Sequence, residues 1–230
     1  MKGAVNDLLG VGIYTVPEAA CLTEVSTSRI RRWLKGYAFR TKSGRGQSPP
    51  VWKSQIESVE GTLALGFLDL MEIRVVEEFL KLGVTWKTIR EAAVRGREIY
   101  RTTHPFCTQP FKTDGRSLFS YVQEKAGEPI LADIVKNQRV FNRILEPFLC
   151  DVEYVDQTIA RWWPMGQRRH VVLDPHRCFG KPIVAREGVP TQVLAQAFAV
   201  EQSIPAVARW YELSPQSVRS AVEFERRFAA

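Results

Sequence analysis

The sequence lacks the long apolar runs and the closely spaced cysteines typical of membrane or secreted proteins. No apolar run reaches the roughly 18–20 residues that a membrane-spanning helix needs. The N-terminal stretch holds one lysine and a short apolar patch that an acidic residue interrupts, which is not the pattern of a secretion signal. Cys21, Cys107, Cys150 and Cys178 are far apart and form no C-x-x-C motif. We therefore expect a cytoplasmic protein whose cysteines are reduced, small and buried.

Motifs of catalysis and cofactor binding are also missing from the sequence. It contains no Walker loop, no G-x-G-x-x-G and no G-x-S-x-G, and no carboxylate pair stands out as an acid–base couple. Only three histidines occur, and one of them lies in the segment DPHRC at residues 174–178. Asp174, His176 and Cys178 are possible metal ligands, but Pro175 between them favours a turn. We therefore interpret this segment as a turn rather than a metal site. We expect no enzyme activity, no metal and no cofactor.

Acidic residues are absent from one long basic stretch. The chain has 230 residues with 32 basic and 25 acidic side chains, a net charge of +7. Residues 1–125 hold 19 basic and 13 acidic side chains, whereas residues 126–230 hold 13 and 12. No Asp or Glu occurs between Arg29 and Lys53, a stretch with eight basic residues. Such a concentration of positive charge is typical of a surface that binds a polyanion such as nucleic acid.

Two helices joined by a tight turn are predicted at residues 15–37. Thr15 and Glu18 have the spacing of a capping box, so a helix should begin at Thr15. Ser26 should cap a second helix. Apolar residues at helical spacing predict the inward face of this second helix: Ile30, Trp33, Leu34 and Tyr37. The following residues, 38–56, are rich in glycine, proline and basic side chains, which favours a loop or β-wing.

The rest of the sequence predicts a mainly α protein with small β elements. Helices are expected at residues 67–83, 85–100 and 132–149, and Asp114-Gly115 predicts a tight hairpin. Short strands are expected at residues 158–164 and 168–175. Three short helices should complete the chain, at residues 191–200, 204–213 and 215–228. The change in texture divides the chain into residues 1–125 and 126–230.

One short pattern occurs three times in the sequence. In this pattern an apolar residue precedes a Ser or Thr cap, and Ile or Val followed by Arg comes a few positions later. The copies lie in residues 16–31, 204–219 and, more weakly, 84–90. Helix-turn-helix units have this shape, and so do core helix pairs that do not contact DNA. Only the first copy, with its following loop, is basic and free of acid. We therefore predict that the first copy reads DNA and that the last packs or binds a protein.

The N-terminal part resembles a MerR-type winged helix-turn-helix over about residues 10–100. The resemblance is carried by residues 14–16, 18–20, 25–26 and 30–33. Glu24 replaces the usual turn glycine, and the wing segment lacks the usual Gly-Tyr-Arg signature. The chain also has no long coiled-coil run and no metal-sensing cysteine pair. This resemblance implies a winged head that binds a duplex DNA operator.

Residues 171–225 resemble a short helical domain, long labelled as of unknown function, that recurs in bacterial antitoxins. The positions that carry this resemblance are Gly180, Pro182, Val184, Gly188, Tyr211, Leu213, Ser214 and Ala221 to Phe224. A MerR-like head joined to this domain resembles the VapB-type antitoxins. The resemblance implies a helix-turn-helix-like three-helix domain and a PIN-domain ribonuclease toxin as partner.

Two functions stay open at this point. The first is an antitoxin that neutralises a PIN-domain toxin and represses its own operon. The alternative is a MerR-like transcription regulator that senses a small molecule in its C-terminal half. In both, base edges should be contacted by Thr27, Ser28, Arg29 and Arg32. Phosphates should be contacted by Arg31, Lys35, Arg40, Lys42, Arg45 and Lys53.

The C-terminal region is expected to hold two protein interfaces. A homodimer fits operator recognition, because one helix-turn-helix reads only a few base pairs. Its expected interface is apolar and consists of Leu194, Phe198, Val207, Trp210, Tyr211, Val222 and Phe224. The alternative is that these residues pack on the middle region of the same chain. A PIN-type active site is a cluster of carboxylates around a metal that belongs to the toxin. Arg226 and Arg227 suit such a cluster, and Phe228 would add an aromatic anchor.

Overall fold

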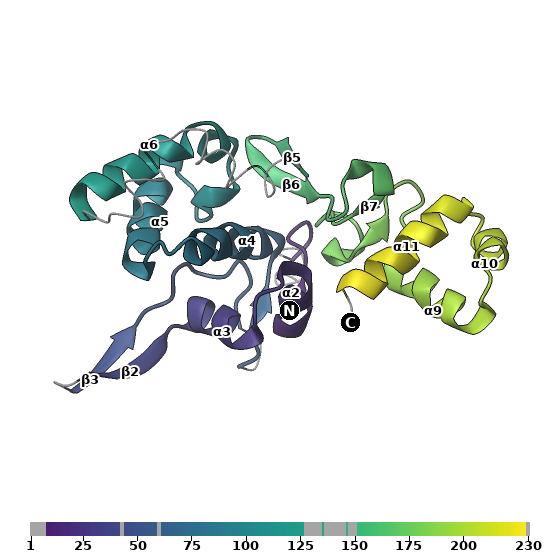
Figure 1. The fold of residues 1–230 in the computed structure, drawn as a ribbon, viewed down its shortest axis with the longest axis horizontal. Coiled ribbons are helices and arrows are strands. Elements are labelled where there is room, and N and C mark those ends of the chain that lie inside the picture. Colours follow the sequence, from purple (N-terminus) through teal and green to yellow (C-terminus); the bar gives the residue numbers. More distant parts are fainter. Residues whose placement is uncertain are drawn as a thin grey trace.

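The computed structural model shows a mainly helical chain with small antiparallel strand pairs, as the sequence predicts (Figure 1). It describes residues 8–41, 44–58, 61–126 and 151–228, together with Val135 and Glu146. Most of the expected helix at 132–149 and Cys150 lie outside these residues. None of the helices in the described ranges is long and apolar enough to cross a membrane.

The predicted N-terminal helix pair is present as α2 (Val16–Thr23) and α3 (Thr27–Lys35). The Thr15 hydroxyl accepts a hydrogen bond from the Glu18 backbone N–H, and the Glu18 carboxylate accepts one of 2.8 Å from the Thr15 N–H. Glu24 ends α2 in the left-handed conformation, with φ 57°. The Ser26 hydroxyl then caps α3. Both predicted helix starts are confirmed.

The predicted wing is a hairpin of β2 (Tyr37–Thr41) and β3 (Gly44–Ser48). Tyr37 was expected on the inner face of α3, and this is wrong. Gly36 ends the helix with φ 71°, and Tyr37 begins β2 as an exposed side chain. A Cβ atom at Gly36 would lie 2.3 Å from the Ser48 carbonyl oxygen, so only glycine fits where the hairpin closes on the helix.

Four further helical segments complete the N-terminal half, which we call the head (residues 8–126). They are α4 (Phe67–Lys81), α5 (Trp86–Tyr100), the 3₁₀ turn η1 (Pro105–Cys107) and α6 (Gln109–Ala126). Of these segments, α4 lies at the centre and is largely buried. Thr85 caps α5 as predicted, because its hydroxyl accepts a hydrogen bond from the Thr88 N–H. A short strand, β4 (Ala64–Leu65), pairs antiparallel with β1 (Tyr14–Thr15), which directly precedes α2 in the sequence.

The hairpin expected at Asp114-Gly115 is wrong, because α6 continues through both residues. Phe111 and Phe119 are fully buried at helical spacing on this helix. A Cβ atom at Gly115 would lie 2.7 Å from the Phe111 ring, so the glycine allows that ring to cover the helix. Burial of this aromatic face overrides the local turn preference of Asp-Gly.

The C-terminal half contains two small strand pairs and the three predicted helices. Its elements are β5 (Val152–Val155), β6 (Thr158–Trp162), η2 (Gln167–Arg169), β7 (Val171–Val172), η3 (Cys178–Gly180), β8 (Ile183–Val184), α9 (Thr191–Glu201), α10 (Ile204–Trp210) and α11 (Pro215–Phe228). Strand β5 pairs with β6, and β7 pairs with β8. In Figure 1, α9, α10 and α11 gather at the end of the molecule away from α6.

Part of the expected dimer interface is instead a core within the chain. The side chains of Leu194, Val207, Val222 and Phe224 are all buried. Of the expected set, Trp210 and Tyr211 are exposed, and Phe198 is partly buried. The spacing of apolar residues predicts a buried helix face, but it does not tell which surface covers that face.

The larger hydrophobic core extends from the head into the C-terminal half. Phe67 and Phe79 of α4 belong to the same cluster as Trp162 of β6 and Phe224 and Phe228 of α11. The cluster therefore contains residues from both sides of the expected domain boundary at residue 125. The boundary itself stays a prediction.

The cysteines differ from the expectation in their burial. Cys107 is buried, whereas Cys21 and Cys178 are exposed. Cys21 points outward from α2, and Cys178 is the exposed first residue of η3. The expectation of buried cysteines is thus wrong at two of the three described positions.

Candidate nucleic-acid interface

The expected DNA-reading residues lie on the outer face of α3. Ile30, Trp33 and Leu34 are buried and fix the inner face against the head. Of the six predicted residues on this helix, Ser28, Arg31, Arg32 and Lys35 are exposed on the opposite face, whereas Thr27 and Arg29 are partly buried. The helix therefore presents hydroxyl and guanidinium groups together, as a recognition helix does.

Two arginines of α3 are held in place by neighbouring side chains. Arg29 donates a hydrogen bond of 2.8 Å from Nη1 to Oε1 of Glu77, whose side chain is 7% exposed, while the Arg29 side chain is 42% exposed. The Arg29 guanidinium also lies 5.3 Å from the Trp33 ring, and that of Arg32 lies 4.6 Å from the Tyr37 ring. Such stacking reduces the conformational freedom that a binding arginine must lose.

The hairpin places two arginines directly opposite each other. Arg40 of β2 pairs in register with Arg45 of β3, and both side chains are exposed. Like charges directly opposite on a strand pair destabilise it, so the pairing favours a surface that meets an anion. Lys42, expected to contact phosphate, lies outside the described residues.

The remaining two predicted cations have partners near α3 and the hairpin. Lys35 donates a hydrogen bond of 3.0 Å to the Gly61 carbonyl oxygen. Lys53 lies 3.5 Å from the Glu57 carboxylate, and both of these side chains are more than four-fifths exposed. An ion pair so exposed to solvent contributes little to stability, so Lys53 stays free to bind an anion.

Helix α5 supports the hairpin through a residue that the sequence did not single out. Nη2 of Arg90 donates hydrogen bonds of 2.7 Å to the Ser48 hydroxyl and 2.6 Å to the Pro49 carbonyl oxygen. Arg97, two turns later, donates one of 2.6 Å to the Val51 carbonyl oxygen. The sequence signal was the Ile-Arg pair of the middle repeat, which nearby acidic residues obscured.

A buried polar network fixes the loop that follows the hairpin. The carboxylate of Asp69 is fully buried and accepts hydrogen bonds of 3.0 Å from Nε1 of Trp52 and 2.8 Å from the Gly66 N–H. Nε2 of His104 lies 3.0 Å from the same carboxylate. Close by, burial raises the pKa of Glu72 to about 7. These partners hold residues 52–55 against α4, and so position the base of the hairpin.

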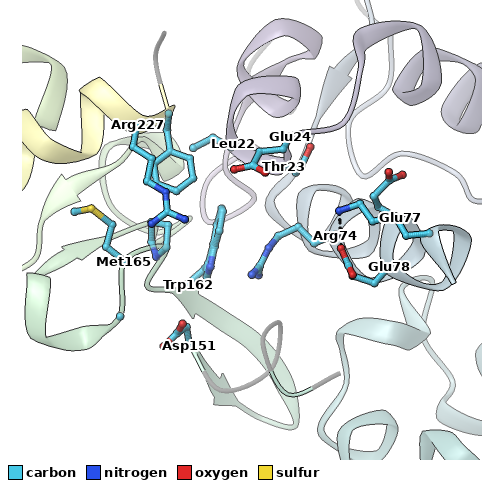
Figure 2. Close-up of a pocket in the computed structure, with 14 residues that line it drawn as sticks. Leu22, Thr23, Glu24, Arg74, Glu77, Glu78, Asp151, Trp162, Met165 and Arg227 are labelled. Atoms are coloured by element: carbon cyan, nitrogen blue, oxygen red, sulfur yellow. Dashed lines mark hydrogen bonds and ion pairs between the residues drawn. The ribbon is translucent and has the colours of Figure 1, made fainter. Parts of the chain in front are cut away.

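A cavity of about 460 Å³ lies where the head meets the C-terminal half (Figure 2). Arg74 of α4 stacks on the Trp162 ring at 4.0 Å within it. Carboxylates and a second arginine from several elements complete the lining: Glu24, Glu77, Glu78, Asp151 and Arg227. Its volume is in the range of small-molecule sites. Within the described residues, no group of three or more His, Cys, Asp or Glu is placed to hold a metal ion.

The chain end has exposed cations but not an exposed aromatic anchor. Arg226 and Arg227 are exposed. Phe228 is 7% exposed and stacks on Phe224 at 4.8 Å between ring centroids. The ring of Phe228 would therefore contact another protein only by leaving the core of this chain.

Three comparisons with known proteins found similar sequences or structures. Residues 171–224 match the family described as "Protein of unknown function (DUF433)". A crystal structure of Rv2018 from Mycobacterium tuberculosis superposes with a TM-score of 0.69 at 22% identity, over 93% of this chain and 99% of that chain. The two proteins share a fold. This chain is also 25% identical, over 226 residues and 93% of each protein, to "Putative antitoxin VapB45" of Mycobacterium tuberculosis (strain ATCC 25618 / H37Rv).

Proposed function

We propose that this chain is the antitoxin of a toxin–antitoxin pair, and that it also represses its own operon by binding duplex DNA. The antitoxin role is supported by the similarity to the Mycobacterium tuberculosis antitoxin over nearly the whole chain. The C-terminal family match falls on the stretch whose sequence resembles an antitoxin domain. The role is regulatory rather than enzymatic.

DNA binding rests on one observation: the joint surface of α3 and the hairpin is basic and has no acid of its own. The sequence from Arg29 to Lys53 contains no carboxylate, and Arg31, Arg32, Arg40 and Arg45 are all exposed on these elements. In a helix-turn-helix, the second helix enters the major groove while the wing contacts the backbone. A homodimer would place two such surfaces on inverted half-sites, with exposed Trp210 and Tyr211 as candidates for the dimer contact.

The test of DNA binding begins with duplexes selected from a random pool by the purified chain. Binding of the selected duplex is then measured by fluorescence anisotropy for the parent, for R29A/R32A and for the control R186A/R209A. The control removes the same charge from exposed positions in the C-terminal half. We expect the first variant to lose affinity at least tenfold and the control to match the parent. With six phosphates neutralised per protomer, the log–log salt slope should be about −5 per protomer. Salt-independent binding, or an unaffected R29A/R32A variant, would overturn the proposal.

The proposed partner is a PIN-domain ribonuclease. Its acidic active site would attract cations, and Arg226 and Arg227 offer two in an exposed position at the end of α11. Co-expression with the product of the adjacent gene tests this directly. The parent chain should restore growth to cells that express that product, and purified complexes should show loss of ribonuclease activity. Unrestored growth with both proteins present at equal levels would overturn the antitoxin role.

A second candidate function is favoured by the cavity in Figure 2. A MerR-like regulator would bind a small molecule in its C-terminal half, and the cavity joins that half to α2 and α4 of the head. If so, a deproteinised cell extract should change the affinity for the selected duplex, and Trp162→Ala should abolish this change. The antitoxin proposal expects operator affinity to be the same with and without the extract.

A further inference from the structure

A small cavity of about 80 Å³ lies between α3, the base of the hairpin and the first turns of α5. Three guanidinium groups line it, from Arg29, Arg32 and Arg90, and so do three aromatic rings, from Trp33, Tyr37 and Trp86. We propose that this cavity is a phosphate subsite in which Arg90 binds one phosphate group of the DNA backbone. The inference rests on the proposed DNA binding and adds a residue and an element, α5, that the DNA-contact set lacked.

One donor of Arg90 has no hydrogen-bond partner among the described residues. Its Nη2 atom is engaged by the Ser48 hydroxyl and the Pro49 carbonyl oxygen. Its Nε atom is buried and makes no hydrogen bond among the described residues. A buried donor that lacks a partner destabilises the fold, and more so if it is charged, so native structures rarely leave one unsatisfied. A phosphate oxygen is the acceptor that such a guanidinium group prefers.

The size and charge of the cavity suit a tetrahedral anion. A volume of about 80 Å³ corresponds to about two or three water molecules, which is the scale of one phosphate group. No carboxylate belongs to its lining, although the carboxylate of Glu77 pairs with Arg29. Because Glu77 compensates the charge of Arg29, Arg32 and Arg90 leave a net positive charge around this small space, and that charge attracts an anion.

The cavity is also placed where a duplex would pass. Its walls come from α3, from the first residue of the hairpin and from Trp86, the first residue of α5. The N-terminus of this 15-residue helix adds a partial positive charge. Trp33 and Trp86 meet edge to face at 5.1 Å and form a rigid apolar wall behind the arginines. A backbone that lies along α3 and the hairpin would thus bring a phosphate over the opening.

Arg97 provides a matched control for the purely structural role of Arg90. Both arginines extend from α5 and donate to backbone carbonyl groups beyond β3, but Arg97 does not line the cavity. The variants R90Q, R90K and R97Q are compared with the parent in binding to the selected duplex over a range of salt concentrations. We expect R90Q to lose about tenfold in affinity and to reduce the salt slope by about 0.9 per protomer. R90K should keep the slope, and R97Q should keep both.

Two further arms identify the source of the phosphate. Duplexes with one neutral methylphosphonate are scanned along the site. When the methylphosphonate stands at one particular position of each half-site, the parent should bind that duplex as weakly as R90Q binds the unmodified duplex. The affinity of R90Q should not fall further at this position. Separately, inorganic phosphate is titrated at constant ionic strength while tryptophan fluorescence is recorded, because Trp33 and Trp86 wall the cavity. The parent should respond and R90Q should not.

The outcomes separate this inference from the proposed function. Phosphate binding that depends on Arg90, without any duplex binding, would overturn the proposed DNA function and the backbone source of the phosphate, while the anion site would stand. Duplex binding with an unchanged salt slope in R90Q and no phosphate response would overturn the subsite alone. Equal losses in R90Q and R97Q would show that Arg90 only supports the hairpin, and would also overturn it.

Discussion

The hydroxyl group of Tyr14 donates a hydrogen bond of 2.6 Å to the carbonyl oxygen of Gly180, 166 residues further along the chain. Burial raises the pKa of the Tyr14 phenol above its ordinary value, so the group remains a donor throughout the physiological range. Gly180 has φ 80°, and a Cβ atom there would lie 2.5 Å from the Tyr14 hydroxyl oxygen. This contact ties β1, which directly precedes α2, to the C-terminal half.

Removal of either member of this contact should destabilise the whole chain. Tyr14→Phe leaves the buried carbonyl group without its partner, so the free energy of unfolding should fall by about 1–2 kcal/mol. Gly180→Ala adds a strained backbone and a close contact, and should cost about 2–3 kcal/mol. Urea unfolding measures both effects, with Tyr211→Phe as a control at an exposed tyrosine. Wild-type stability in Gly180→Ala would show that the two halves are not held together here.

The two kinds of residue at the chain end should separate stability from toxin binding. Phe228→Ala empties a buried position beside Phe224 and should lower the free energy of unfolding by about 2–4 kcal/mol. Arg226→Ala with Arg227→Ala changes exposed side chains and should stay within about 0.5 kcal/mol of the parent. Under the proposed function the double variant binds the toxin at least tenfold more weakly and keeps DNA affinity. Full toxin affinity would place the inhibitory contact elsewhere.

Stability should fall as pH rises through neutrality because of Glu72. Burial raises the pKa of this carboxyl group from 4.5 to about 7, with His104, Arg97 and a backbone N–H opposing the shift and Asp69 adding to it. Between these values the folded state keeps a proton that the unfolded state has released, so this group's contribution is lost as pH rises. The loss should reach about 3 kcal/mol between pH 4.5 and pH 8.

Glu72→Gln isolates that pH effect. The variant keeps a side-chain oxygen for the Phe106 N–H but cannot ionise. Its free energy of unfolding should vary less with pH, and at pH 8 it should exceed that of the parent. Glu57→Gln, at an exposed carboxylate, should leave the parent's pH dependence unchanged. Parallel curves for Glu72→Gln and the parent would contradict the prediction.

Arg45→Ala should weaken DNA binding without weakening the fold. The substitution removes the like-charge pair with Arg40, so the free energy of unfolding should stay equal or rise by up to about 0.5 kcal/mol. The salt slope of DNA binding should drop by about 0.9 per protomer, since one phosphate contact is lost. Gln47→Ala, on the same strand, should match the parent in both measurements. A destabilised Arg45→Ala would mean that the arginine supports the hairpin instead.

Local signals in the sequence predicted element starts well, because a cap depends on residues three positions apart. Thr15, Ser26 and Thr85 each cap a helix where expected. The hairpin prediction at Asp114-Gly115 was wrong because burial of the aromatic face of α6 outweighed the local turn preference. These outcomes show how far short-range patterns extend before tertiary packing takes over.

The candidate site was predictable in its charge but not in its assembly. The acid-free stretch indicated α3 and the hairpin directly. Arg90 was missed because Glu91 follows it in sequence, although Arg90 bonds to Ser48 and Pro49 while Glu91 is exposed to solvent. The burial of Phe228 depends on contacts beyond its own helix, which no periodicity along the sequence reveals.

The hydrophobic cluster that links α4 with Phe224 and Phe228 also bears on how such a protein can be recombined. A chimera that joined this C-terminal half to a foreign head would expose the apolar surface that the native head covers. It would also lose the Tyr14 hydroxyl group, which donates a hydrogen bond to the Gly180 carbonyl oxygen. The head and the C-terminal half of such proteins can therefore be exchanged only together with the residues of their contact surface. Substitutions at Tyr14 and Phe228 should accordingly be transferred together.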